Sequence, residues 1–277
     1  MKIMVNKRFW LGILVMVLAF GMTVVGCDDG NGDSSIAYVA VTDIINVPSM
    51  MPFGSPLSLN GTVLPDNATN KTIIWSVKTA NNSGAAINGN KLTVTNFGTD
   101  WGNIIINASI IKGKTEDTDF SRDFWINIRT YNKMSQTLYF RGAVHDNGTP
   151  NWIIAEDLIL QDTLTGQLEK NTSYKVVIKG VLDTSLEGLY LNICGNSPEE
   201  GEYEWTYLCD GAILEDTISA GTITREFIVK TKNNNDVTRY GNKAFIALWN
   251  FQPVAETDIG KMMAKISNFS WTITKLE

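Results

Sequence analysis

The apolar and polar positions beyond residue 36 predict strands and almost no helix. Short runs rich in Val, Ile, Thr and aromatic residues are separated by clusters of Asn, Gly, Asp and Pro. Residues 57–63 alternate apolar and polar side chains, as a half-buried strand does. Residues 245–249 are apolar throughout, as inner strands of a packed sandwich are. We therefore expect an all-β fold.

The expected strands fall into two groups, separated by the polar residues 129–135, which lack alternation and are expected to form a linker. Each group is long enough for one β-sandwich domain, the first over residues 37–128 and the second over residues 136–277. In the first domain the strands are expected at 39–47, 57–63, 72–77, 92–95, 104–111 and 124–128. In the second they are expected at 137–140, 152–154, 174–182, 188–194, 203–208, 222–230, 244–251 and 263–274.

A specific motif lies in the first domain. Leu64-Pro65 is followed by Asn-Ala-Thr-Asn-Lys at 67–71 and then by Trp75 within a strand. This arrangement resembles the bacterial immunoglobulin-like domains of group 2 type, whose later glycine–strand pattern is matched by residues 89–94 and 102–108. The resemblance covers about ninety residues and implies an Ig-like sandwich with Trp75 in its core. The family serves as a spacer in adhesins and surface enzymes, so this fold alone specifies no ligand.

Two looser motifs lie in the second domain. Residues 166–178 contain a leucine, a polar spacer, a tyrosine and an alternating strand, and residues 266–273 form a closing strand around a tryptophan. Both segments resemble parts of the jelly-roll carbohydrate-binding modules. This resemblance implies a jelly-roll-like β-sandwich, without indicating a particular family.

The N-terminal segment has the features of an export signal. Lys2, Lys7 and Arg8 precede an uncharged apolar run over residues 9–25, which ends at Cys27. Val24-Val25-Gly26-Cys27 resembles the lipobox of bacterial lipoproteins, although the usual leucine is Val24 here. The resemblance implies a signal peptide at 1–26 and acylation of Cys27, which anchors the protein to a membrane. An uncleaved transmembrane anchor is the alternative, because the run could just span a bilayer.

Residues 27–36 are polar and rich in glycine, so we expect a flexible tether. The protein is expected in the bacterial cell envelope, lipid-anchored and extracytoplasmic, at the outer membrane or cell surface rather than the inner membrane. Asp28 leaves this choice open, because an Asp after the lipidated cysteine marks inner-membrane retention in some Gram-negative bacteria.

The net charge and the scarcity of catalytic residues exclude several classes of function. The chain has a net charge of −6 and no basic cluster, so it is a poor candidate for binding nucleic acid. The one histidine, His145, lies in a turn-like sequence, and no nucleophile elbow or phosphate-binding glycine loop is present. Carboxylate pairs such as Glu156/Asp157 are adjacent, so on a strand they would point to opposite faces. We expect no enzymatic activity and no cofactor, and the sequence leaves bound calcium or another metal open.

The aromatic residues of the second domain are the candidate ligand-binding residues. On an extended segment Tyr203, Trp205 and Tyr207 share one face, and a row of rings suits stacking against sugars. The alternative is that these rings fill the sandwich core. Trp152 lies at a loop-to-strand junction where it could face a ligand, whereas Trp249 lies in a hydrophobic strand and is expected in the core.

Cys194 and Cys209 are the cysteines that remain after the N-terminal one. Strands at 188–194 and 203–208 flank a turn, so a hairpin would bring the two thiols together and a disulfide is expected. The alternative is two separate buried thiols.

These observations favour a membrane-anchored, non-catalytic binding protein whose second sandwich engages carbohydrate. The alternative is an adhesive or structural surface lipoprotein that contacts a surface protein and has no sugar ligand. Exposure of the row from Tyr203 to Tyr207 would favour the first hypothesis, and burial of all three rings would favour the second.

Overall fold

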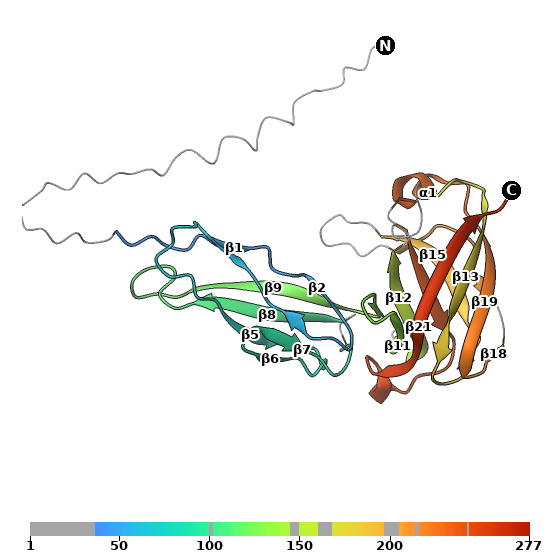
Figure 1. The fold of residues 1–277 in the computed structure, drawn as a ribbon, viewed down its shortest axis with the longest axis horizontal. Helices are drawn as coiled ribbons and strands as arrows, with labels where there is room; N and C mark the ends of the chain where they lie inside the picture. Colours follow the sequence, from blue (N-terminus) through green and yellow to red (C-terminus); the bar gives the residue numbers. More distant parts are fainter. Residues whose placement is uncertain are drawn as a thin grey trace, which may run out of the picture. The chain divides into compact units, whose positions relative to one another are not determined.

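The computed structural model describes residues 37–99, 102–144, 150–159, 168–196, 205–213, 216–242 and 244–277 (Figure 1). Strands dominate these ranges, which contain one short α-helix, α1 (Asn235–Tyr240), and one short 3-10 helix at Glu256–Asp258. None of the helices within the described ranges is long and apolar enough to cross a membrane. The expected all-β fold is confirmed.

The first region contains three small sheets that enclose its core. The largest has the strand order β2-β9-β8-β5, in which β2 runs parallel to β9 and the other neighbours are antiparallel. The others are β3-β7-β6 and the pair β1-β4. The strands are β1 (Asp43–Ile45), β2 (Met50–Pro52), β3 (Leu57–Ser58), β4 (Thr62–Leu64), β5 (Ile74–Thr79), β6 (Ala86–Asn88), β7 (Lys91–Thr93), β8 (Asn103–Ile110) and β9 (Phe120–Arg129).

Alternation along β8 explains how this region forms a core. Ile104, Ile106, Ala108 and Ile110 are buried, and the residues between them are only partly covered. Trp75, expected in the core, is partly buried there, with its ring centroid 6.3 Å from that of Phe124.

The second region is one sheet with the strand order β16-β15-β20-β12-β11-β21-β13-β19, with β10 paired to β11 and β17 to β15. Figure 1 shows β21, β13 and β19 side by side. The strands are β10 (Tyr131–Asn132), β11 (Thr137–Val144), β12 (Pro150–Ile159), β13 (Ser173–Leu182), β15 (Tyr190–Asn196), β16 (Trp205–Tyr207), β17 (Ala212–Ile213), β19 (Gly221–Lys230), β20 (Phe245–Asn250) and β21 (Met262–Lys275). A separate pair joins β14 (Leu186–Glu187) to β18 (Thr217–Ile218).

The sheet of the second region folds over on itself to enclose one core. Phe140 of β11, Leu191 of β15 and Leu248 of β20 lie in the same buried cluster as Val176 of β13 and Phe227 of β19. Strands β16, β15, β20, β12 and β11 therefore form one layer, and β21, β13 and β19 form the other. This arrangement is a β-sandwich.

Residues 129–135, expected to form a linker, are ordered by hydrogen bonds of their own polar groups. Thr130 and Asn132 are each only 1% exposed, and β10 pairs with β11. The side-chain amide of Asn132 donates to Ser55 Oγ at 2.7 Å, and its oxygen accepts from the backbone N–H of Met134 at 3.1 Å. The polar sequence of this segment therefore reflects a hydrogen-bonded hairpin.

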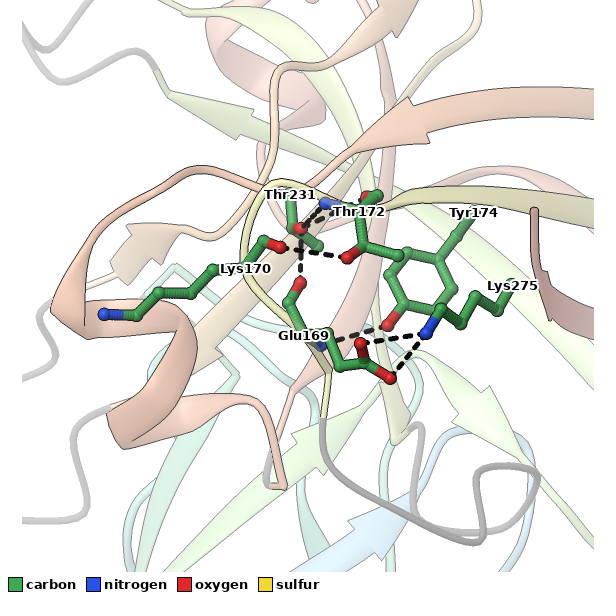
Figure 2. Close-up of polar contacts among 6 residues, drawn as sticks. All are labelled: Glu169, Lys170, Thr172, Tyr174, Thr231 and Lys275. Carbon is green, nitrogen blue, oxygen red and sulfur yellow. Dashed lines mark hydrogen bonds and ion pairs between the residues drawn. The ribbon is translucent and has the colours of Figure 1, made fainter. Parts of the chain in front are cut away.

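The leucine–spacer–tyrosine motif forms a loop that is tied down at both ends (Figure 2). Leu168 and Tyr174 are both 3% exposed and lie in the core, and the Tyr174 hydroxyl accepts from the backbone N–H of Glu169 at 3.0 Å. The Lys275 ammonium bonds both oxygens of the Glu169 carboxylate at 2.7 and 2.8 Å.

Thr231 fastens the same loop from the other side, as Figure 2 shows. Its hydroxyl donates to the carbonyl of Glu169 at 2.5 Å and accepts from the backbone N–H of Thr172 at 2.9 Å. The next residue, Lys232, donates its backbone N–H to the carbonyl of Leu208 at 2.8 Å. The segment after β19 is thereby held between this loop and Leu208, the residue that directly follows β16.

Candidate functional site

The candidate site lies on the outer face of the layer that contains β20. Every residue of β20 is buried, so both faces of this strand are covered. Ile246 and Leu248 point into the sandwich core, whereas Phe245, Ala247 and Trp249 join a separate cluster on the opposite side. The alternation of a strand places these two sets on opposite faces.

Aromatic rings from neighbouring strands surround Trp249. The centroid of its ring lies 4.6 Å from that of Tyr190, 6.2 Å from that of Tyr207 and 6.4 Å from that of Trp152, which is tilted from it by only 12°. Phe251 stands edge-on to Trp152 and Tyr190, at 6.2 and 6.0 Å. We call Trp152, Tyr190, Tyr207, Trp249 and Phe251 the aromatic face.

Exposure divides the aromatic face into a floor and a rim. Trp249 is 4% exposed and forms the floor, Trp152 and Tyr190 are half-buried, and Tyr207 and Phe251 are 40% and 50% exposed. The outer face of the other layer is different, because β13, β19 and β21 present mainly Lys, Thr and Ser there. Among the described residues of the second region, the exposed rings of Tyr207 and Phe251 therefore both lie on the outer face of this layer.

Polar side chains lie beside the rings of the aromatic face. Tyr190 hydrogen-bonds with Asn192, and burial raises the pKa of the Tyr190 phenol. The Lys232 ammonium lies 5.9 Å from the centroid of the Tyr207 ring, close enough for a cation–π contact. Arg141 is 5% exposed and lies opposite Ile154 in the β11–β12 register. Hydroxyl, amide and cationic donors therefore border the aromatic face.

Gly211 is required for the position of Tyr190. A Cβ at Gly211 would overlap the phenol ring of Tyr190, so only glycine leaves room for this ring. The backbone of the segment before β17 therefore helps to fix the ring in place.

The structure brings together two of the four residues predicted from the sequence as ligand-binding. Trp152 and Tyr207 both belong to the aromatic face. Trp205 lies in β16, where the structure describes its backbone but not its side chain. Tyr203, His145 and the predicted lipidation site Cys27 lie outside the described residues.

Sequence reasoning missed the centre of the site. Trp249 is buried as expected, but it lies on the outer face of the layer and not between the layers. Tyr190 and Phe251 were not predicted. A signal for Tyr190 exists in Leu-Tyr-Leu-Asn-Ile at residues 189–193, where alternation places Tyr190 and Asn192 opposite the leucines.

The expected disulfide between Cys194 and Cys209 is not formed. Strands β15 and β16 do pair, but the register places Tyr207 opposite Cys194. Cys194 packs in the cluster of the outer face, whereas Cys209 packs in the core. Cys209 Sγ accepts from the backbone N–H of Ile193 at 3.3 Å and donates to Asn192 Oδ1 at 3.1 Å. Burial raises the pKa of the Cys209 thiol to about 12.

Within the ranges that the structure describes, no group of three or more His, Cys, Asp or Glu side chains is arranged to hold a metal ion.

Comparisons with known proteins give distant likenesses. No family model matches the chain, and no curated protein matches it. Among solved structures, a cyclase from Fischerella sp. TAU in complex with 4-(1H-indol-3-yl)butan-2-one is 12% identical, with 77% of this chain and 93% of that chain covered and a TM-score of 0.29. A CBM4 structure is 13% identical, with 80% and 96% covered and a TM-score of 0.26. Both TM-scores are too low to support an argument about function.

Proposed function

We propose that this protein is a non-catalytic carbohydrate-binding protein whose second sandwich holds a glycan on the aromatic face. The observation that carries the proposal is the exposed Tyr207 and Phe251, which stand with the half-buried Trp152 and Tyr190 around one buried tryptophan. The apolar face of a sugar ring stacks on aromatic rings, and polar groups beside the rings bond its hydroxyls.

The expected affinity is modest and shared among the rings. An aromatic contact contributes about 1 kcal/mol beyond area burial, which is about a fivefold change in dissociation constant. No single ring of the rim should therefore account for binding. Loss of two rings should weaken binding by more than a factor of about ten.

The alternative function, adhesion to a protein partner without a sugar ligand, is less well supported. Burial of all three rings from Tyr203 to Tyr207 would have favoured it, and Tyr207 is 40% exposed. The exposed Tyr207 supports the carbohydrate hypothesis at one of the three positions of the row.

Affinity electrophoresis in gels containing xylan, laminarin or mixed-linkage glucan tests the proposal with the full-length protein in detergent. Tyr207→Ala and Phe251→Ala should each reduce retardation by a polysaccharide that retards the wild type, and the double variant should reduce it further. Ile228→Ala is the matched control, because Ile228 is 66% exposed on the polar outer face of the other layer. Unchanged retardation of the double variant would refute a role for the aromatic face.

We also propose that acylated Cys27 anchors the protein on the extracytoplasmic side of the envelope, at the outer membrane or surface. The basic start, the apolar run and the Val-Val-Gly-Cys ending support this assignment. Cys27→Ser should abolish labelling with radioactive palmitate and release the protein from membranes. Membrane association that persists without incorporated lipid would indicate a transmembrane anchor instead.

A further inference from the structure

A second exposed tryptophan lies in the first region, on the outer face of the sheet β2-β9-β8-β5. Trp125 is 59% exposed, whereas its strand neighbour Ile126 is fully buried and Ile128 is 3% exposed. Alternation along β9 therefore directs Trp125 away from the core. An indole ring that is mostly exposed contributes little to the stability of the fold, so packing does not explain the presence of Trp125 on the surface.

The surroundings of Trp125 combine a small apolar patch with amides. Ile105 lies directly opposite it on β8, and Met50, 49% exposed, lies on the adjoining strand β2. Two residues further along the strands, on the same face, the Asn127 amide donates to Asn103 Oδ1 at 2.9 Å. We call Met50, Ile105, Trp125 and these two asparagines the Trp125 surface.

Charged groups near the Trp125 surface are engaged with other groups. Lys78 and Asp123 form an ion pair, and the hydrogen bond from Lys78 lowers the pKa of the Asp123 carboxyl. The Asn107 amide also donates to Asp123 at 2.8 Å. The Arg129 guanidinium contacts Met50 Sδ at 3.1 Å. This electrostatic arrangement complements a neutral ligand better than a strongly charged one.

The size of the surface favours a small ligand over a protein. Three apolar side chains offer a few hundred Å² at most, whereas a stable protein interface buries roughly 800 Å² on each partner. One sugar unit needs only the face of a single ring and a few hydrogen-bonding groups beside it. The exposed indole and its neighbouring amides meet this requirement.

We propose that the Trp125 surface is a second carbohydrate-binding site, which takes a neutral glycan independently of the aromatic face. The argument uses only residues of the first region, so it does not depend on the function proposed for the second. Two sites that engage one polysaccharide would also raise the apparent affinity above that of either site alone.

The test is 19F NMR of the full-length protein in detergent, labelled with 5-fluorotryptophan, with the Trp125 line assigned from its loss in Trp125→Phe. Titration with laminarin, xylan and mixed-linkage glucan should shift this line in a saturable way for at least one polysaccharide. In affinity gels with that polysaccharide, Trp125→Ala should raise the dissociation constant about fivefold or more. Ile74→Ala, at a 45% exposed position of the same sheet, should leave it unchanged.

Different outcomes separate the two proposals. A shift of the Trp152 line with a static Trp125 line would overturn the second site and leave the aromatic face supported. A static Trp125 line with all three polysaccharides would overturn the second site whatever the other lines do. Equal or stronger binding to the anionic polysaccharide pectin would contradict the preference for a neutral ligand.

Discussion

Thr231→Val keeps the shape of a buried side chain but removes the hydroxyl that fastens the loop over residues 169–172. The hydroxyl is a donor to Glu169 and an acceptor for Thr172, and the residue is 2% exposed. Each net hydrogen bond contributes about 0.5–1.5 kcal/mol, and a buried group left without its partner costs about 1–3 kcal/mol. We expect the free energy of unfolding to fall by about 2–4 kcal/mol.

Urea unfolding followed by circular dichroism measures this change in the free energy of unfolding. The slope of that free energy against urea concentration should stay the same, because the variant exposes the same surface on unfolding. Thr224→Val, at an exposed position of β19, is the matched control and should change stability by less than about 0.5 kcal/mol. If Thr231→Val also changes the free energy of unfolding by less than about 0.5 kcal/mol, the stability of the loop does not depend on this hydroxyl and the reasoning is wrong.

Four further outcomes follow from burial. Cys194 and Cys209 should both resist alkylation in the native protein and both react after unfolding, which mass spectrometry detects; a bonded pair would contradict this. Because the folded pKa of Cys209 is about 12 and the ordinary value is 9.0, stability should fall as the pH rises above about 9, measured by urea midpoints. Trp249→Ala should cost about 3–5 kcal/mol of stability, and Tyr207→Ala much less. Asn250→Leu should stabilise the protein by about 1 kcal/mol or more, because both amide atoms of Asn250 are buried without a hydrogen-bond partner; destabilisation in thermal melts would show that the amide is needed.

Local alternation made the long strands of the second region predictable. The expected strand at 174–182 is β13, and the one at 222–230 is β19, each within one residue at its start. Alternation is a property of neighbouring residues, so one sequence is enough to detect it. The order within the expected linker could not be predicted, because the sequence shows that Asn132 is polar but not that it bonds Ser55.

The site was only partly predictable because it depends on register. Trp152, Tyr190 and Trp249 come from three strands, and pairing alone brings their rings together. A hydrophobic strand such as β20 is covered on both faces, and its sequence does not say which face belongs to the core. The same limit applies to the thiols, because the register places Tyr207 opposite Cys194 and β16 ends at Tyr207, so Cys209 lies beyond the paired residues.

The placement of the two thiols also bears on how the chain would fold in an oxidising compartment, the location proposed above. Oxidation of Cys194 and Cys209 in a nascent chain would tie together a residue of the outer-face cluster and a residue of the core, and this bond would oppose the native packing. Such a bond is a kinetic trap and not a step toward the native state. Once β15 is enclosed by its neighbours, Cys194 and Cys209 are both buried, so the folded sheet itself would shield the two sulfurs from an oxidant.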